Sequence, residues 1–194
     1  MSEPAQTPGS LEPLPPESAP QPPAPEPYRW GWRQYLALVA ILATVAALRL
    51  YVVESAIVDG GSMRPTLRSG DYVLVYKLAY ASTRLPERGE IVTFTSPIEP
   101  GDILVKRVVG LPGDYVQYVN SWVLVNGVAM GRMAPAPGWR DERPEYVPPG
   151  HVYVLGDNRG NSEDSRDWGP VSAAALRGRA LLVYLPPGRL GVVR

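Results

Sequence analysis

One serine of this chain, Ser62, lies within the stretch DGGSMRPTLRSGD, residues 59–71, directly after two glycines. A serine hydroxyl becomes a strong nucleophile only when a neighbouring base takes its proton. The candidate bases are few, because the chain has one histidine, His151, two lysines, Lys77 and Lys106, and no cysteine. The lack of cysteine excludes a thiol nucleophile and a disulfide framework, and with one histidine it argues against a zinc site. We therefore expect no metal and no cofactor.

Lys106 is the lysine whose surroundings best suit a base. It lies in DILVKRVVGL, a run typical of a β-strand. Alternation along a strand would place Leu104, Lys106 and Val108 on one face, and a covered face would lower the pKa of the amine from about 10.4. From the strand alone, a lysine that reaches to water is the commoner arrangement. Lys77 enters a polar turn and His151 follows a Pro-Gly turn, so both positions suit exposed side chains better.

A third polar stretch is GDNRGNSEDSRDWG, residues 156–169. A calcium-binding loop is excluded, because Arg159 and Trp168 stand where oxygen ligands would be needed. A solvated loop is the simplest alternative. Acids, arginines and serines at this density can also form a hydrogen-bonded network that supports a site. The candidate members of that network are Asp157, Arg159, Ser162, Asp164 and Arg166.

An apolar run precedes the serine and predicts a membrane span. Residues 35–53 contain a single charge, Arg49, and as a helix they would extend about 28 Å, close to the thickness of the bilayer hydrocarbon. With its flanks the predicted transmembrane helix covers 28–53. A buried helix of a soluble protein remains the alternative. Basic residues before the run and acidic residues after it predict a cytoplasmic N-terminus.

The segments on either side of this run differ in composition. Residues 1–27 hold ten prolines, four glutamates and no basic residue, which predicts a disordered proline-rich cytoplasmic tail. Residues 54–194 hold short β-branched and aromatic runs between Gly, Pro and Asp turns, which predict a mostly β, antiparallel domain outside the cytoplasm. Within it, Asn126-Gly127 fits a type I′ hairpin turn, and 130–150 is expected to be a long irregular connection. A net charge of zero gives no sign of nucleic-acid binding.

Taken together, the motifs resemble those of the type I signal peptidases, which are membrane-anchored serine proteases with a Ser-Lys dyad. The segments SMRPTL, GDYVLVYK, RGEIVTF, DILVKRVVGLPGD and GDNRGNSEDSRDWG follow in the order that this family has. The resemblance covers nearly everything from Arg49 to the end of the chain. Five such segments in order are far more specific than one.

The resemblance implies a role for each candidate residue. Ser62 would be the nucleophile and Lys106 its general base, and Ser162 would hydrogen-bond the lysine amine. Around them, the family pattern implies that Asp157, Arg159, Asp164 and Arg166 hold the surrounding loops and that Gly60, Gly61, Met63 and Pro65 shape the turn and the oxyanion hole. Some family members carry a hydroxyl residue where this chain has Gly60, so the second oxyanion donor is left unnamed.

The same resemblance implies partners and a location. The enzyme would cut signal peptides from exported preproteins as a single-pass protein of the bacterial cytoplasmic (inner) membrane. Its partners would be those peptides, the lipid bilayer and the protein export machinery, with no nucleic acid. Two alternatives stay open. A self-cleaving Ser-Lys repressor would need a DNA-binding domain where this chain has a proline tail, and a membrane-anchored binding module would not need Ser62 and Lys106.

Overall fold

The computed structural model describes residues 31–119, 122–132 and 143–194, so the predicted tail, 1–27, lies outside the described residues. Helix α1 (Trp32–Ala47) comes first and continues into a π-helical turn, η1 (Leu48–Val52). These 21 residues have no buried side chain and are long and apolar enough to cross a membrane. They cover most of the predicted span. Val53 was placed in that span by the sequence, but it begins a strand instead.

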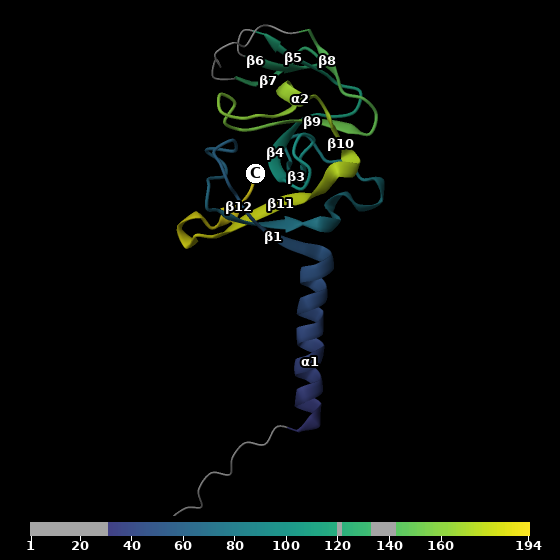
Figure 1. Ribbon diagram of the computed structural model, residues 1–194, viewed down its shortest axis with the longest axis vertical. Helices are drawn as coiled ribbons and strands as arrows, with labels where there is room; N and C mark the ends of the chain where they lie inside the picture. Colours follow the sequence, from purple (N-terminus) through teal and green to yellow (C-terminus); the bar gives the residue numbers. More distant parts are fainter. Residues whose placement is uncertain (1–30, 120–121, 133–142) are drawn as a thin grey trace, which may run out of the picture. The chain divides into compact units, whose positions relative to one another are not determined.

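Residues 39–194 form one compact unit, and its strands make two antiparallel sheets (Figure 1). The larger sheet has the order β1-β2-β11-β3-β4-β9-β10, with β12 paired to β11, and the smaller has the order β7-β6-β5-β8. The strands of the larger sheet are β1 (Val53–Ile57), β2 (Tyr72–Tyr76), β3 (Ile91–Thr95), β4 (Ile103–Gly110), β9 (His151–Leu155), β10 (Val171–Ser172), β11 (Leu176–Leu185) and β12 (Gly191–Val192). Those of the smaller sheet are β5 (Tyr115–Val119), β6 (Trp122–Val125), β7 (Val128–Arg132) and β8 (Glu145–Tyr146).

Short helical turns occupy four of the connections. They are the 3-10 turns η2 (Lys77–Thr83), η3 (Ala173–Ala175) and η4 (Pro187–Arg189), and the helix α2 (Ser165–Trp168). The fold class is therefore the predicted one, a mostly β antiparallel domain preceded by a single apolar helix.

Apolar alternation along the strands explains why the sheets pack. Valine, leucine and other apolar side chains form three buried clusters, and each cluster contains side chains from several strands. One cluster includes Met63 and Leu67, which are 1% and 0% exposed, so the serine-bearing turn is anchored in the core beside β2 and β11. At about 25 cal/mol per Å² of buried apolar area, each such side chain contributes roughly 2 kcal/mol to the stability of the fold.

The hairpin predicted at Asn126-Gly127 is confirmed. Asn126 has φ 53° and Gly127 has φ 79°, the positive values that a type I′ turn requires at both central positions. The sequence predicted six runs as strands, at residues 71–78, 90–96, 102–111, 121–130, 151–157 and 180–186, and β1, β5, β8, β10 and β12 were not among them. Three of the strands that were not predicted, β8, β10 and β12, are only two residues long, and β8 interrupts the connection expected to be irregular across 130–150.

Candidate active site

The turn that carries Ser62 is fixed at both ends. The Val58 N–H donates to Asp71 O at 2.9 Å and the Gly70 N–H donates to Val58 O at 2.9 Å, which closes the loop on itself. Gly60 has φ +87°, a backbone conformation that residues other than glycine adopt only with strain. Glycine at this position therefore answers a backbone requirement.

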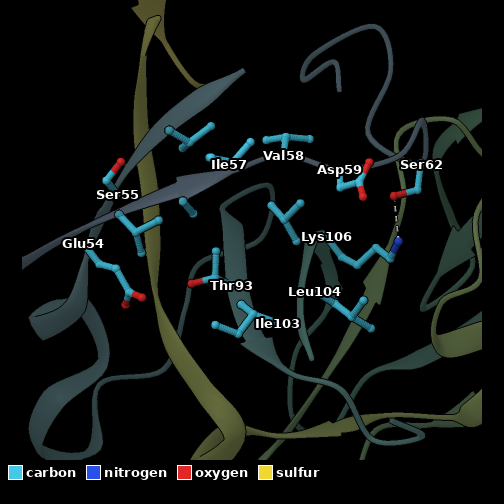
Figure 2. Close-up of a pocket in the computed structure, with 14 residues that line it drawn as sticks. Glu54, Ser55, Ile57, Val58, Asp59, Ser62, Thr93, Ile103, Leu104 and Lys106 are labelled. Carbon is cyan, nitrogen blue, oxygen red and sulfur yellow. Dashed lines mark hydrogen bonds between the residues drawn. The ribbon is translucent and has the colours of Figure 1, made fainter. Parts of the chain in front are cut away.

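Lys106 projects from β4 toward that turn. Its Nζ donates to Ser62 Oγ at 2.8 Å (Figure 2). The side chain is 4% exposed, and Val108 and Leu104 pack in the cluster beside it, as the predicted alternation requires. Burial lowers the pKa of the Lys106 amine from its ordinary value of 10.5, while the negative charge of Asp164 acts in the opposite direction. The structure thus brings the two residues expected to form the dyad into direct contact.

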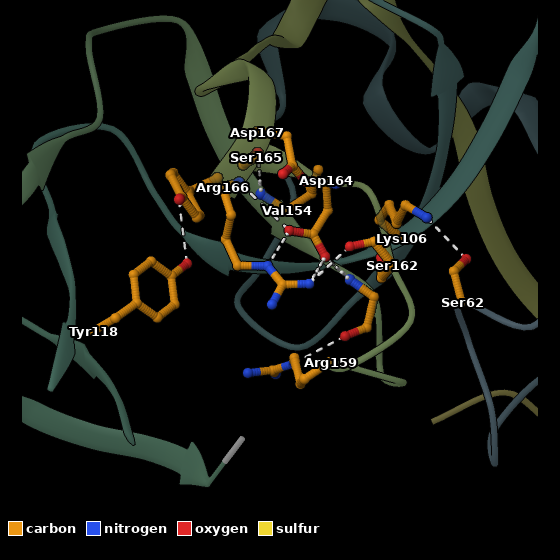
Figure 3. Close-up of polar contacts among 12 residues, drawn as sticks. Ser62, Lys106, Tyr118, Val154, Arg159, Ser162, Asp164, Ser165, Arg166 and Asp167 are labelled. Atoms are coloured by element: carbon orange, nitrogen blue, oxygen red, sulfur yellow. Dashed lines mark hydrogen bonds and ion pairs between the residues drawn. The ribbon is translucent and has the colours of Figure 1, made fainter. Parts of the chain in front are cut away.

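A buried ion pair organises the loop that follows β9. Asp164 and Arg166 meet with Nε to Oδ1 at 2.6 Å, and their side chains are 0% and 2% exposed (Figure 3). Asp164 also accepts from the Gly156 N–H at 2.9 Å, and it caps helix α2 together with Asp167. Arg159 Nε donates to Gly156 O at 2.9 Å. These bonds hold the two ends of the loop, 156 and 164–166, against each other.

Ser162 differs from expectation. Its Oγ is buried and has no hydrogen-bond partner among the residues that the structure describes, so the expected bond to the Lys106 amine is not formed. The Lys106 amine is instead directed at Ser62 (Figure 3). Ser162 is nevertheless packed in the same region, since a Cβ added at Gly156 would lie within 2.6 Å of both Ser162 Cβ and Ser62 O.

Asp157 connects the loop to the strand of the lysine. Its carboxylate accepts from Arg107 Nε and Nη2, each at 2.7 Å, and from Thr66 Oγ1 at 2.6 Å. Arg107 follows Lys106 on β4 and Thr66 lies on the serine turn. One carboxylate therefore ties together the three segments that meet at the site.

Sequence reasoning missed two residues that touch the serine turn directly. The Asn158 N–H donates to Ser62 O at 2.8 Å, and Asn158 Nδ2 donates to Gly61 O at 3.0 Å. Gly156 allows this approach, because any side chain there would collide with Ser62 O. Both residues stand in the GDN triplet that opens the third polar stretch, and their position beside the charged residues was the only signal that could have singled them out.

The main-chain N–H of Ser62 has no hydrogen-bond acceptor within residues 31–119, 122–132 and 143–194. The Gly61 carbonyl belongs to the same planar peptide unit and lies opposite to this N–H. The bonds that Gly61 O accepts from Asn158 Nδ2 and, at 3.2 Å, from the Arg64 N–H therefore fix the direction in which the Ser62 N–H points.

A groove of about 300 Å³ leads to the dyad. One wall is β1 with Val58 and the other is β4, and Ser62 and Lys106 lie at one end (Figure 2). Most of the lining is aliphatic, with Ile57, Val73, Val75, Ile103 and Leu104 among its members. An extended peptide segment fits such a groove between two strands.

The other candidate bases lie elsewhere. Lys77 Nζ donates to Leu50 O at 2.8 Å, and His151 Nδ1 lies 3.1 Å from Pro149 O. Across the described parts of the chain, no group of three or more His, Cys, Asp or Glu side chains could hold a metal ion.

Comparison with known proteins gives a consistent set of relatives. The profile of a family described as signal peptidase, peptidase S26, matches residues 31–185. A probable signal peptidase I-2 from Synechocystis sp. is 37% identical over 162 residues, which cover 80% of this chain and 74% of the relative. Signal peptidase I of Leptolyngbya laminosa is 35% identical over 200 residues, with 98% and 96% covered. A crystal structure of a signal peptidase I from Enterococcus faecalis V583 is 30% identical, covers 50% of this chain and 97% of its own, and has a TM-score of 0.41.

Proposed function

Since the chain belongs to the signal peptidase family, peptidase S26, and is thus a serine endopeptidase, we propose that it removes signal peptides from exported preproteins with Ser62 and Lys106 as a catalytic dyad. The observation that carries the proposal is the 2.8 Å contact between Lys106 Nζ and Ser62 Oγ. At this distance a proton can pass between the buried amine and a hydroxyl that lines the groove.

In the first step, neutral Lys106 accepts the Ser62 proton while Ser62 Oγ attacks the carbonyl carbon of the scissile bond. Lys106 then passes that proton to the departing amine, which leaves as the new N-terminus of the mature protein. A water that Lys106 deprotonates releases the signal peptide from the acyl-enzyme. Burial of the amine serves both steps, because it raises the fraction of lysine that is neutral near neutral pH.

The tetrahedral oxyanion would be held by the Ser62 N–H, which has no acceptor within the described ranges and is oriented by Asn158. One preorganised donor of this kind is worth about 3 to 4 kcal/mol in the transition state. The loop ion pair of Asp164 and Arg166 holds the main chain near Gly156, which in turn abuts the Ser62 carbonyl.

The chain would work at the surface of the bacterial cytoplasmic membrane. The apolar helix Trp32–Val52 would span the bilayer once, with the N-terminus in the cytoplasm and residues 54–194 outside. Ser62 follows the end of that helix by ten residues, which is at most about 35 Å of chain, so the site can stay close to the lipid surface. A signal peptide anchored in the same bilayer presents its cleavage point there.

The test is cleavage of a purified preprotein by the detergent-solubilised full chain, with mass spectrometry locating the cut. We expect the wild type to cut at the signal junction, and Ser62→Ala and Lys106→Met to fold normally and lose cleavage. Lys77→Met is the matched lysine control and should retain cleavage, because Lys77 contacts the Leu50 carbonyl and not the dyad. An intact preprotein with the wild type, or cleavage by Lys106→Met, would refute the proposed function.

A further inference from the structure

The end of the substrate groove farthest from the dyad carries a carboxylate. Glu54 lines the same groove as Ser62 and Lys106, and Figure 2 shows it at the opposite side of the cavity from them. The β1–β2 register pairs Glu54 with Val75 and Ala56 with Val73, and directly paired residues of antiparallel strands share a face. Glu54 therefore lies on the groove-facing side of β1.

This carboxylate has no counter-charge of its own. Glu54 makes no ion pair or hydrogen bond with any residue in the described ranges 31–119, 122–132 and 143–194, and its side chain is partly buried. The neighbouring lining is aliphatic, from Val73, Val75 and Ile103. A carboxylate that is partly removed from water without a partner loses solvation, and a bound donor or cation would compensate for that loss.

The chain direction shows which part of a substrate reaches Glu54. Glu54 follows the end of the apolar helix, Val52, by two residues, whereas Ser62 follows it by ten. The residues of a preprotein that precede the cut are the ones joined to its membrane-embedded signal core. They must therefore occupy the Glu54 end of the groove, and the mature sequence must leave at the other end.

The strand spacing then gives the substrate position. Glu54 lies on β1 and Val58 follows its last residue, Ile57, so the two are four residues apart, which at about 3.3 Å per residue is about 13 Å. An extended substrate has the same spacing along its own chain. The substrate residue beside Glu54 therefore lies at least four residues before the substrate residue beside Val58, which is the one near the dyad. This corresponds to about the fifth and sixth residues before the cut.

We propose that Glu54 is a specificity-determining residue that favours basic or hydrogen-bond-donating side chains, and disfavours acidic ones, at about the fifth and sixth positions before the cleavage point. The inference rests on the proposed function and deepens it by naming a feature of the preferred substrates. It concerns charge at a distance from the scissile bond and leaves the dyad chemistry unchanged.

The test compares three preproteins that are identical except for Lys, Gln or Glu at the fifth and sixth positions. The full chain in detergent should show a kcat/KM about tenfold higher for the Lys than for the Glu substrate at low salt, and a smaller ratio at 1 M NaCl. The ratio should fall to about one in Glu54→Gln and invert in Glu54→Lys. Glu87→Lys is the control for Glu54→Lys, because it changes the net charge by the same amount at a side chain that is 77% exposed. It should keep the wild-type ratio.

Each outcome separates this inference from the proposed function. The Gln substrate carries no charge at the tested positions, so every variant should still cut it at the signal junction. If no variant cuts it, the proposed function fails. If all cut it but the Lys-to-Glu ratio is near one in the wild type, or survives in Glu54→Gln, the assignment of Glu54 is wrong.

Discussion

Gly156 offers a sharp test of how tightly the loop is fitted against the turn that carries Ser62. A Cβ added there would lie 2.6 Å from the Ser62 main-chain oxygen and 2.5 Å from Ser162 Cβ. Ordinary contact begins at about 3.4 Å, so Gly156→Ala must push the Ser62 main chain or the loop away by about 0.8 Å. A displacement on the order of 1 Å at a reacting group reduces the rate by about 10²-fold, or about 2.7 kcal/mol of barrier.

The measurement is kcat/KM on a preprotein together with thermal unfolding of the same sample. Gly110→Ala is the matched control, because its Cβ would lie 2.8 Å from both Tyr153 Cβ and Val116 Cγ2, in a core cluster that does not include the serine turn. We expect both variants to unfold at lower temperature, and only Gly156→Ala to lose about 10²-fold in kcat/KM per folded molecule. Wild-type kcat/KM in folded Gly156→Ala would refute the account of the site as a close fit between loop and turn.

Three further outcomes follow from the same geometry. In a pH-rate profile, kcat/KM should rise with pH as Lys106 loses its proton. The midpoint should lie below 10.5, because burial lowers the pKa of Lys106, and a midpoint above 10.5 would contradict a buried base. Asn158→Ala keeps the main-chain bond to Ser62 O but leaves Gly61 O with only its 3.2 Å bond from the Arg64 N–H, so kcat should fall about 10-fold or more with KM nearly unchanged in steady-state kinetics. Arg166→Met should lower the free energy of unfolding in urea by about 3 to 5 kcal/mol, because it leaves the 0% exposed carboxylate of Asp164 without its partner, and a loss below 1 kcal/mol would contradict this.

The sequence predicted the parts of the fold that depend on local pattern. Alternating valines predicted the long strands, and Asn126-Gly127 predicted its turn because only a few residues tolerate positive φ at both positions. Strand β1 was missed because its sequence, VESAI, contains no aromatic residue and follows directly on an apolar helix. Strands of two residues, such as β10, have too few positions to show any period.

The site was predicted less completely, for a physical reason. Ser62 and Lys106 could be named because they stand in SMRPTL and DILVKRVVGLPGD, two of the segments that resemble those of the type I signal peptidases, whereas the strand alone favoured a lysine that reaches to water. Gly156 and Asn158 act through space on the serine turn, and a glycine or asparagine in a polar loop looks the same whether or not such a contact exists. The expected bond at Ser162 could not be judged from sequence, since it depends on where one hydroxyl points in a packed loop.

The loop ion pair also explains how the fold can place a carboxylate near a lysine that the proposed mechanism requires to be neutral. The charge of Asp164 raises the pKa of Lys106, whereas the charge of Arg166 lowers it. Arg166 lies 2.6 Å from Asp164 and offsets part of its effect, and burial of the amine outweighs the remainder together with the raising effects of Glu163 and Asp167. Asp164 can therefore bind the Gly156 N–H and cap α2 without holding Lys106 in its protonated form. Burial of the amine is then left as the dominant influence on its pKa, which is the condition that a lysine base requires.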